Sequence, residues 1–341
     1  MIITPEPLKK GDTIAIASPA GAVREPLIVE QATDVLRSRG YNVVTAPHCL
    51  TRNGYYSGTR EERASDFAAL ITDNNIKAIL CSYGGYGCVH LLDELSPLIA
   101  RHPKWIIGMS DCSALHAACV ASGVQSIHAP QCRHIAQHPH HPATEALFNI
   151  LAGNKPHYKT APHRLNIQGT AQGRIAGGNL SVIAGLAGSN YDIFTEGRIV
   201  FIEDTGELPY RVERLMYQLK LSGALGKIKG LIVGQFNGVK EHTGFGGTTQ
   251  ELIHNIIKDY NIPVCFNFPV GHCDENYPII EGCEVALSVG ECGSELTFEM
   301  PTTKQTSKFI VKLLYRTPVI LYRQPLILYR IYKKEFYRAS I

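Results

Sequence analysis

A serine stands where an apolar segment ends and a helical pattern begins. The segment Lys104–Ala118 reads Lys-Trp-Ile-Ile-Gly-Met-Ser-Asp-Cys-Ser-Ala-Leu-His-Ala-Ala, which predicts a strand that breaks at Gly108 and a helix that begins two or three residues later. Ser110 then lies in the turn, where the helix dipole and free N–H groups favour negative charge. Two interpretations are open: Ser110 is a nucleophile, or Ser110 or Asp111 is only the N-cap of the helix.

A turn with three glycines is a candidate for the second part of such a site. Ile79–Gly87 reads Ile-Leu-Cys-Ser-Tyr-Gly-Gly-Tyr-Gly, a buried type of strand followed by glycines that let the backbone approach a ligand closely. We predict that the N–H groups of Gly85 and Asp111 form an oxyanion hole, in which one donor contributes about 3–4 kcal/mol. The alternative is a tight turn that only needs positive φ.

Two carboxylates and a histidine follow strands later in the chain. Gly197–Glu207 reads Gly-Arg-Ile-Val-Phe-Ile-Glu-Asp-Thr-Gly-Glu and brings Glu203 and Asp204 to the end of an expected strand. Phe268-Pro-Val-Gly-His-Cys-Asp brings His272 into a loop after another strand, where an imidazole can reach across a cleft. Taken alone, each segment is equally typical of a hydrogen-bonded loop.

Other motifs point away from nucleotide and metal chemistry. The sequence contains no Walker A motif, no G-x-G-x-x-G after a strand, and no H-E-x-x-H, S-x-x-K or G-x-S-x-G. The glycine loop 244–249 is more typical of a turn than of a phosphate cradle. The cluster of His138, His140 and His141 has no carboxylate or thiolate support, which favours a solvated loop. We therefore expect neither a metal nor a cofactor.

Alternating apolar and amphipathic runs predict two α/β domains. Over residues 1–135 the alternation is typical of βαβ units, so we predict an N-terminal domain with a parallel, Rossmann-like sheet. Residues 136–165 are rich in His and Pro, and we expect an exposed connector. Over residues 166–300 the alternation resumes, which predicts a second, β-rich α/β domain. The strands expected are 13–17, 42–46, 77–82, 105–108, 198–202, 231–235, 264–268, 284–289 and 295–299. The helices expected are 25–39, 60–72, 88–95, 113–120, 210–222 and 249–259.

Length and charge agree with a folded two-domain protein that does not bind nucleic acid. The chain has 341 residues, above the roughly 250–300 at which a single core stops growing. Its net charge of +3 hides a basic tail, because residues 301–341 hold nine Lys and Arg and one Glu. The rest carries 24 basic and 29 acidic residues, or −5, and gives no electrostatic reason to bind nucleic acid.

The two ends suggest a location. The first ten residues have no apolar run of signal-peptide length, so we expect a cytoplasmic protein whose ten cysteines are reduced and mostly buried. In the tail, Leu-Tyr-Arg recurs every seven residues, at 314, 321 and 328, and the intervening prolines exclude a coiled coil. The tail is either without function or a surface that makes weak contact with membranes or partners.

Five motifs together resemble one family. Cys81–Gly87, Gly108–Asp111, Gly177-Gly-Asn-Leu180, the run from Ile202 to Arg211 and Pro269–His272 are similar, in order, to motifs of the LD-carboxypeptidases. That family of serine peptidases includes muramoyltetrapeptide carboxypeptidases and microcin C self-immunity proteins. The resemblance extends from about Leu8 to Met300 and leaves the tail outside.

The resemblance implies a Ser-Glu-His triad in a cleft between the two domains. It assigns Ser110 as nucleophile, His272 as general base and Glu203 as the carboxylate that orients the histidine, roles that suit these side chains. It also implies a homodimer. One position departs from the family pattern, because Tyr83 stands where Arg often precedes Gly-Gly, which bears on recognition of a substrate carboxylate.

The resemblance implies a hydrolase that removes the terminal D-alanine from murein tetrapeptides during cell-wall recycling. A second reading is an immunity-type hydrolase that cleaves a peptidyl-nucleotide amide with the same triad. A third reading, from another class, is a catalytically silent protein that binds murein peptides.

Overall fold

The computed structural model describes residues 2–238 and 246–299. The basic tail lies outside these residues, as does the beginning of the glycine loop 244–249. Within them, two sheets and their helices form one compact unit. No helix in the described part is long and apolar enough to cross a membrane.

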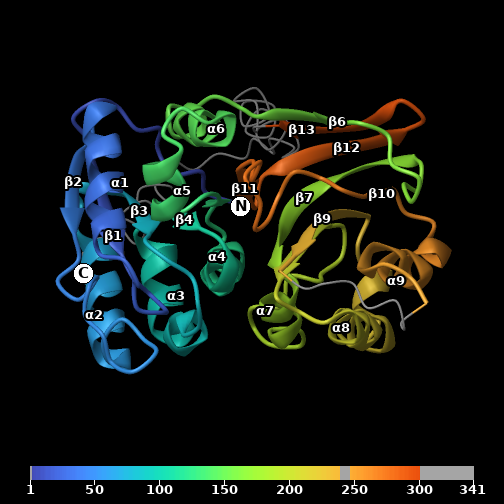
Figure 1. The fold of residues 1–341 in the computed structure, drawn as a ribbon, viewed down its shortest axis with the longest axis horizontal. Helices are drawn as coiled ribbons and strands as arrows, with labels where there is room; N and C mark the ends of the chain where they lie inside the picture. Colours follow the sequence, from blue (N-terminus) through green and yellow to red (C-terminus); the bar gives the residue numbers. More distant parts are fainter. Residues whose placement is uncertain (1, 239–245, 300–341) are drawn as a thin grey trace, which may run out of the picture. The chain divides into compact units, whose positions relative to one another are not determined.

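The first sheet has six strands in the order β11-β5-β4-β3-β1-β2, and all its pairs except β11–β5 are parallel. The order 2-1-3-4-5 is that of a doubly wound sheet, in which ligands bind beyond the carboxyl ends of the strands. Helices α1 and α5 pack together, and α2 and α4 both pack against α3 (Figure 1). The elements are β1 (Thr13–Ala17), α1 (Leu27–Ser38), β2 (Asn42–Thr45), α2 (Arg60–Thr72), β3 (Ile76–Cys81), α3 (Leu92–Arg101), β4 (Trp105–Gly108), α4 (Ser113–Ala121), β5 (Ser126–His128), α5 (Cys132–Gln137) and β11 (Ile279–Glu281).

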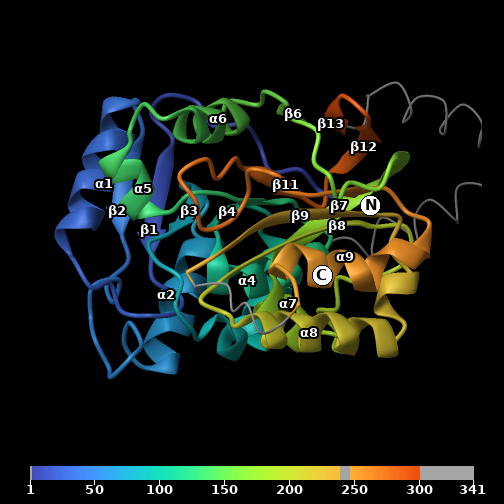
Figure 2. The ribbon, with the colours of Figure 1, turned by 45° about the vertical axis from the view of Figure 1, so that its right-hand side comes forward.

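The second sheet has seven strands in the order β10-β9-β8-β7-β12-β13-β6. Its β10-β9-β8-β7 half is parallel, and β7, β12, β13 and β6 pair antiparallel. Helix α4 of the first half packs against β7 and α7 of the second, and so joins the two halves (Figure 2). The elements are α6 (Pro142–Leu151), β6 (His157–Thr160), β7 (Gly169–Asn179), α7 (Leu180–Gly185), β8 (Ile199–Thr205), α8 (Pro209–Leu221), β9 (Gly230–Asn237), α9 (Thr249–Ile257), β10 (Val264–Cys265), β12 (Glu284–Gly290) and β13 (Gly293–Glu299).

The expectation of an exposed connector over residues 136–165 was wrong. Helix α6 buries an apolar face that includes Leu147 and Leu151, and β6 pairs with β13 at the edge of the second sheet. The His and Pro residues mark the start of a helix rather than a loop. The side chain of His141 accepts a hydrogen bond from the N–H of Ala143, and Pro142 occupies the first helical position, where its missing N–H is harmless.

One short strand joins the sheet formed by the other half of the chain. β11 lies within the range expected for the second domain, but it pairs antiparallel with β5 and extends the first sheet. The chain therefore crosses between the halves a second time, just after the loop that contains His272. The cysteines follow the expectation of burial: eight of the ten are buried, and Cys273 and Cys292 are the exceptions.

Candidate active site

Ser110 occupies a sharp turn between β4 and α4. Its φ is 61°, a left-handed value that is unusual for a residue other than glycine and is typical of strained functional positions. The alternative that Ser110 or Asp111 caps α4 is wrong, because the N-cap position belongs to Cys112 and no side chain caps the helix. The Asp111 carboxylate instead accepts a hydrogen bond from the N–H of Cys88 (2.8 Å), and burial raises its pKa to about 6.

The turn after β3 lies directly against Ser110. A Cβ on Gly84 would be 2.9 Å from Oγ of Ser110, so only glycine fits at this position. The carbonyl of Gly84 accepts a hydrogen bond from the N–H of Gly21 (2.9 Å). Because the C=O and N–H of a trans peptide point in opposite directions, the N–H of Gly85 points away from Gly21. Gly85 also has a φ of 93°, so the turn does require a residue that tolerates positive φ, as the alternative interpretation expected.

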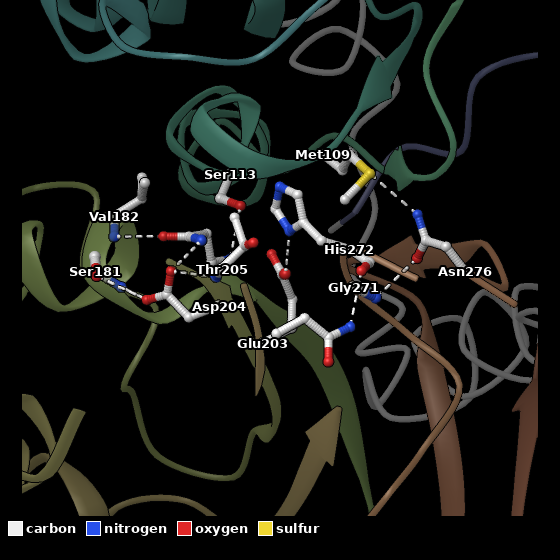
Figure 3. Close-up of polar contacts among 12 residues, drawn as sticks. Met109, Ser113, Ser181, Val182, Glu203, Asp204, Thr205, Gly271, His272 and Asn276 are labelled. Carbon is white, nitrogen blue, oxygen red and sulfur yellow. Dashed lines mark hydrogen bonds and ion pairs between the residues drawn. The ribbon is translucent and has the colours of Figure 1, made fainter. Parts of the chain in front are cut away.

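Glu203 and His272 form a close pair between β8 and the loop after β10. His272 Nδ1 lies 2.8 Å from Oε2 of Glu203, and the two side chains point toward one another (Figure 3). The carboxylate is fully buried, whereas the imidazole is 26% exposed. Gly271 has a φ of 120°, and a Cβ there would be 2.8 Å from Cβ of Glu203. A glycine before His272 is therefore needed for this approach.

The pair has the electrostatics of a base held by a carboxylate. Burial lowers the pKa of His272, but the hydrogen bond and charge of Glu203, with the charge of Asp204, outweigh it, so the pKa is raised from its ordinary value. Burial raises the pKa of Glu203, and the contact with His272 opposes that rise. The carboxylate thus fixes the Nδ1–H tautomer, which leaves Nε2 as the proton acceptor.

A second polar network joins α4 to the strand that carries Glu203. The N–H of Asn179 donates to Oγ of Ser113 (2.9 Å), and Asn179 Nδ2 donates to Oδ1 of Asp204 (2.7 Å). Ser181 donates to Oδ2 of Asp204 from both its N–H (3.0 Å) and its hydroxyl (2.7 Å) (Figure 3). Gly178 packs so closely on Ser113 that a Cβ would be 2.2 Å from Oγ. Both oxygens of Asp204 are therefore held by hydrogen bonds within the fold.

A single cavity of about 720 Å³ contains the sequence-predicted residues. Gly85, Ser110, Asp111 and His272 line it, and Glu203 lies behind His272. The lining comes from both halves of the chain, so the cleft lies between them, as expected. No described contact joins Ser110 Oγ to the imidazole. Such hydrogen bonds are often formed only once substrate is bound.

Three of the residues that build this cleft were not predicted from the sequence. Tyr55 and Glu207 line the cavity, and the buried side chain of Asn276 bonds to the His272 loop. Glu207 lies four residues beyond Glu203 at the same strand end, which was a usable signal. For Asn276 and Tyr55 the sequence contains no such signal, because isolated loop residues belong to no periodic pattern.

The weaker candidates have structural roles. His140 lies 3.6 Å from Glu145, and His138 and His141 pack their rings against His134. Across residues 2–238 and 246–299, no group of three or more His, Cys, Asp or Glu side chains is arranged to hold a metal ion.

Comparison with known proteins agrees with this geometry. Models of the LD-carboxypeptidase N-terminal and C-terminal domains match residues 14–129 and 172–287. A Synechocystis sp. protein named as a carboxypeptidase is 33% identical, covering 86% of this chain and 96% of its own. The crystal structure of muramoyltetrapeptide carboxypeptidase from Oxalobacter formigenes has a TM-score of 0.77 and 28% identity, covering 85% of this chain and 100% of that one.

The microcin C7 self-immunity protein MccF is also similar. The Escherichia coli protein is 25% identical, covering 88% of this chain and 97% of its own. The structure of MccF in complex with aspartyl sulfamoyl adenosine has a TM-score of 0.78 at 25% identity, covering 87% of this chain and 99% of that one. Both halves of the chain match, so it belongs to the LD-carboxypeptidase family and is a serine-type carboxypeptidase of the hydrolase class.

Proposed function

We propose that this protein releases the terminal D-alanine from murein tetrapeptides, with Ser110, His272 and Glu203 as its catalytic triad. The observation that carries the proposal is one cavity lined both by a strained serine from the first half of the chain and by a histidine of the second half that is hydrogen-bonded to a carboxylate. The choice of substrate is supported by the similar structure from Oxalobacter formigenes, which is named as a muramoyltetrapeptide carboxypeptidase.

The proposed reaction begins at the serine. Nε2 of His272 takes the proton of Ser110 as Oγ attacks the carbonyl carbon of the bond to D-alanine. Glu203 accepts a hydrogen bond from the Nδ1–H of His272 and stabilises the imidazolium. The N–H groups of Gly85 and Asp111 donate to the oxyanion. His272 then gives its proton to the leaving amine, D-alanine departs, and water activated by His272 hydrolyses the acyl-enzyme.

A second candidate is cleavage of a peptidyl-nucleotide amide. Tyr55, Tyr83 and Tyr86 line the cavity, and aromatic rings of this kind can stack on a nucleobase. The likeness to MccF, solved with aspartyl sulfamoyl adenosine, supports this candidate. Tyr83 also bears on the first candidate, because a phenol is a weaker partner for a terminal carboxylate than Arg.

One assay separates the candidates. The purified protein is incubated with disaccharide-tetrapeptide and, separately, with a peptidyl-adenylate analogue, and the products are identified by mass spectrometry. The expected result is that the disaccharide-tetrapeptide releases D-alanine and the peptidyl-adenylate analogue is not cleaved. Turnover of the analogue alone would favour the immunity-type reaction, and turnover of neither would favour a silent binding protein.

The assignment as a carboxypeptidase depends on a free carboxyl end. The expected result is little action on an amidated tetrapeptide, whose end cannot make charge-assisted hydrogen bonds. Equal rates on the free and amidated tetrapeptides would overturn the assignment. The homodimer, the cytoplasmic location and a weak contact of the tail with membranes stay predictions, which light scattering, fractionation and vesicle binding test respectively.

A further inference from the structure

The cavity around Ser110 is acidic. Among the described residues that line it, Asp111, Asp204 and Glu207 carry carboxylates and none is Lys or Arg. A carboxylate that faces a ligand site without a fixed partner favours a cationic group on that ligand.

Two of the three are already committed to the fold. Both oxygens of Asp204 accept hydrogen bonds, from Asn179 and the N–H of Thr205 on one side and from Ser181 on the other. Asp111 is 3% exposed and accepts from the N–H of Cys88. Neither can turn to a ligand without leaving a buried donor unpaired, which costs about 1–3 kcal/mol.

Glu207 is the carboxylate that remains. Its Oε2 is shielded from solvent and has no hydrogen-bond partner in the described part of the chain. A guanidinium nitrogen of Arg211 lies 3.5 Å from it, beyond the usual N–H···O distance, and the Arg211 side chain is 54% exposed. The Glu207 side chain is itself 25% exposed, and a pair as open as this contributes about 0–1 kcal/mol, so a ligand cation can replace Arg211 beside the carboxylate.

We propose that Glu207 binds the side-chain ammonium of the diamino acid next to the scissile bond. This inference rests on the proposed function and names its substrate class: tetrapeptides whose third residue ends in a side-chain ammonium. In the intact muropeptide the α-nitrogens are amides, so this ammonium is the cation beside the bond that Ser110 attacks. An ammonium can donate three hydrogen bonds, which suits a carboxylate whose Oε2 accepts none from the described residues.

The test compares two substrates that differ only in that charge. They are L-Ala-D-isoGlu-L-Lys-D-Ala and the same peptide with an Nε-acetylated lysine. For the unaltered protein, the expected kcat/KM is about 10- to 100-fold higher for the free lysine, the range of one hydrogen bond to a charged group. Glu207→Gln should lower kcat/KM for the lysine peptide to about that of the acetylated peptide, so that the ratio between the two peptides falls to about one.

The matched control is Glu213→Gln, which removes a carboxylate from helix α8, just after Glu207 in the chain but outside the cavity lining. It should keep the preference for the charged lysine. Equal rates of the unaltered protein on both peptides, or a preference that survives in Glu207→Gln, would overturn the inference. If no tetrapeptide is cleaved, the proposed function fails. Binding of the two peptides to the unaltered protein by calorimetry then decides the ammonium preference separately.

Discussion

Asn276 bonds to the immediate neighbours of both Ser110 and His272. Its Nδ2 donates to Sδ of Met109 (3.1 Å), and its Oδ1 accepts from the N–H of Gly271 (2.9 Å). The side chain is 2% exposed, and Figure 3 shows it beside the loop of His272. One buried amide therefore connects the nucleophile turn of the first half to the histidine loop of the second.

We predict that Asn276 sets the distance between the serine and the imidazole. Asn276→Leu keeps the size of the side chain but leaves the N–H of Gly271 without its acceptor, and should lower kcat about 10-fold with little change in KM. Steady-state kinetics and thermal melting check this.

The control for Asn276 is a bridging asparagine away from the cavity. Asn166 accepts from the N–H of Phe266 and donates to Ser294. Asn166→Leu should lower the melting temperature by a similar amount and leave kcat unchanged. If both variants lose only stability, Asn276 has a structural role and does not position the site.

The triad predicts a non-additive loss of activity. Ser110→Ala should lower kcat by at least about 10⁴-fold, and His272→Ala should do the same, because base and nucleophile act as a unit. The double variant should be no slower than either single variant. Ser122→Ala, at the far end of α4, is the control and should keep full activity. Near-normal hydrolysis by Ser110→Ala would exclude the serine mechanism.

The pH profile should report the raised pKa of His272. A general base must be neutral, so kcat/KM should rise with pH through a pKa above the ordinary 6.5 of histidine. Glu203→Gln removes the main cause of the rise and leaves the burial that lowers the pKa. The acidic limb should therefore move to lower pH while kcat falls.

A second histidine–carboxylate pair provides the control for that profile. His48 Nδ1 lies 2.9 Å from Oδ1 of Asp66, which raises the pKa of His48, and neither residue lines the cavity. Asp66→Asn should leave the acidic limb in place. An acidic limb that moves with Asp66→Asn and not with Glu203→Gln would contradict the role of His272.

Local patterns predicted the bounds of several elements, including the strand that precedes Ser110. The expected strands 13–17 and 105–108 and the helix 60–72 have the same bounds in the structure, because apolar runs and a Thr59–Glu62 capping box define them locally. The expected strands also placed Ser110, Glu203 and His272 just beyond strand ends. The family resemblance supplied their roles.

Non-local pairing explains what the sequence did not predict. β5 and β11 have three residues each, too few for a periodic pattern, and they pair across more than 140 positions of the chain. The strand expected over 264–268 ends at Cys265, two residues before Asn267 takes a φ of 57°. Side chains such as Asn276 gain their roles only from such tertiary arrangements.

The same crossing strand contains a buried acid. Glu281 on β11 is fully buried, and its Oε2 accepts a hydrogen bond from the N–H of Gly177 (3.0 Å). Its Oε1 has no hydrogen-bond partner among the described residues. Burial raises the pKa of Glu281 to about 8 from an ordinary 4.5, although the Gly177 bond and the charge of Arg198 oppose the rise.

Glu281 should make the folded state less stable as pH rises. The folded form keeps a proton up to about pH 8, whereas the unfolded form loses it near pH 4.5, so the stability contribution is full below pH 4.5 and is lost toward pH 8. Glu281→Gln keeps an acceptor for Gly177 and does not titrate. At about 1.36 kcal/mol per pKa unit, its free energy of unfolding should exceed that of the unaltered protein by a few kcal/mol at pH 8.5 and match it at pH 4.5. Urea unfolding at both pH values measures the difference, with the exposed Glu291→Gln as a control that shows none. A constant difference at both pH values would mean that Glu281 is ionised in the folded protein.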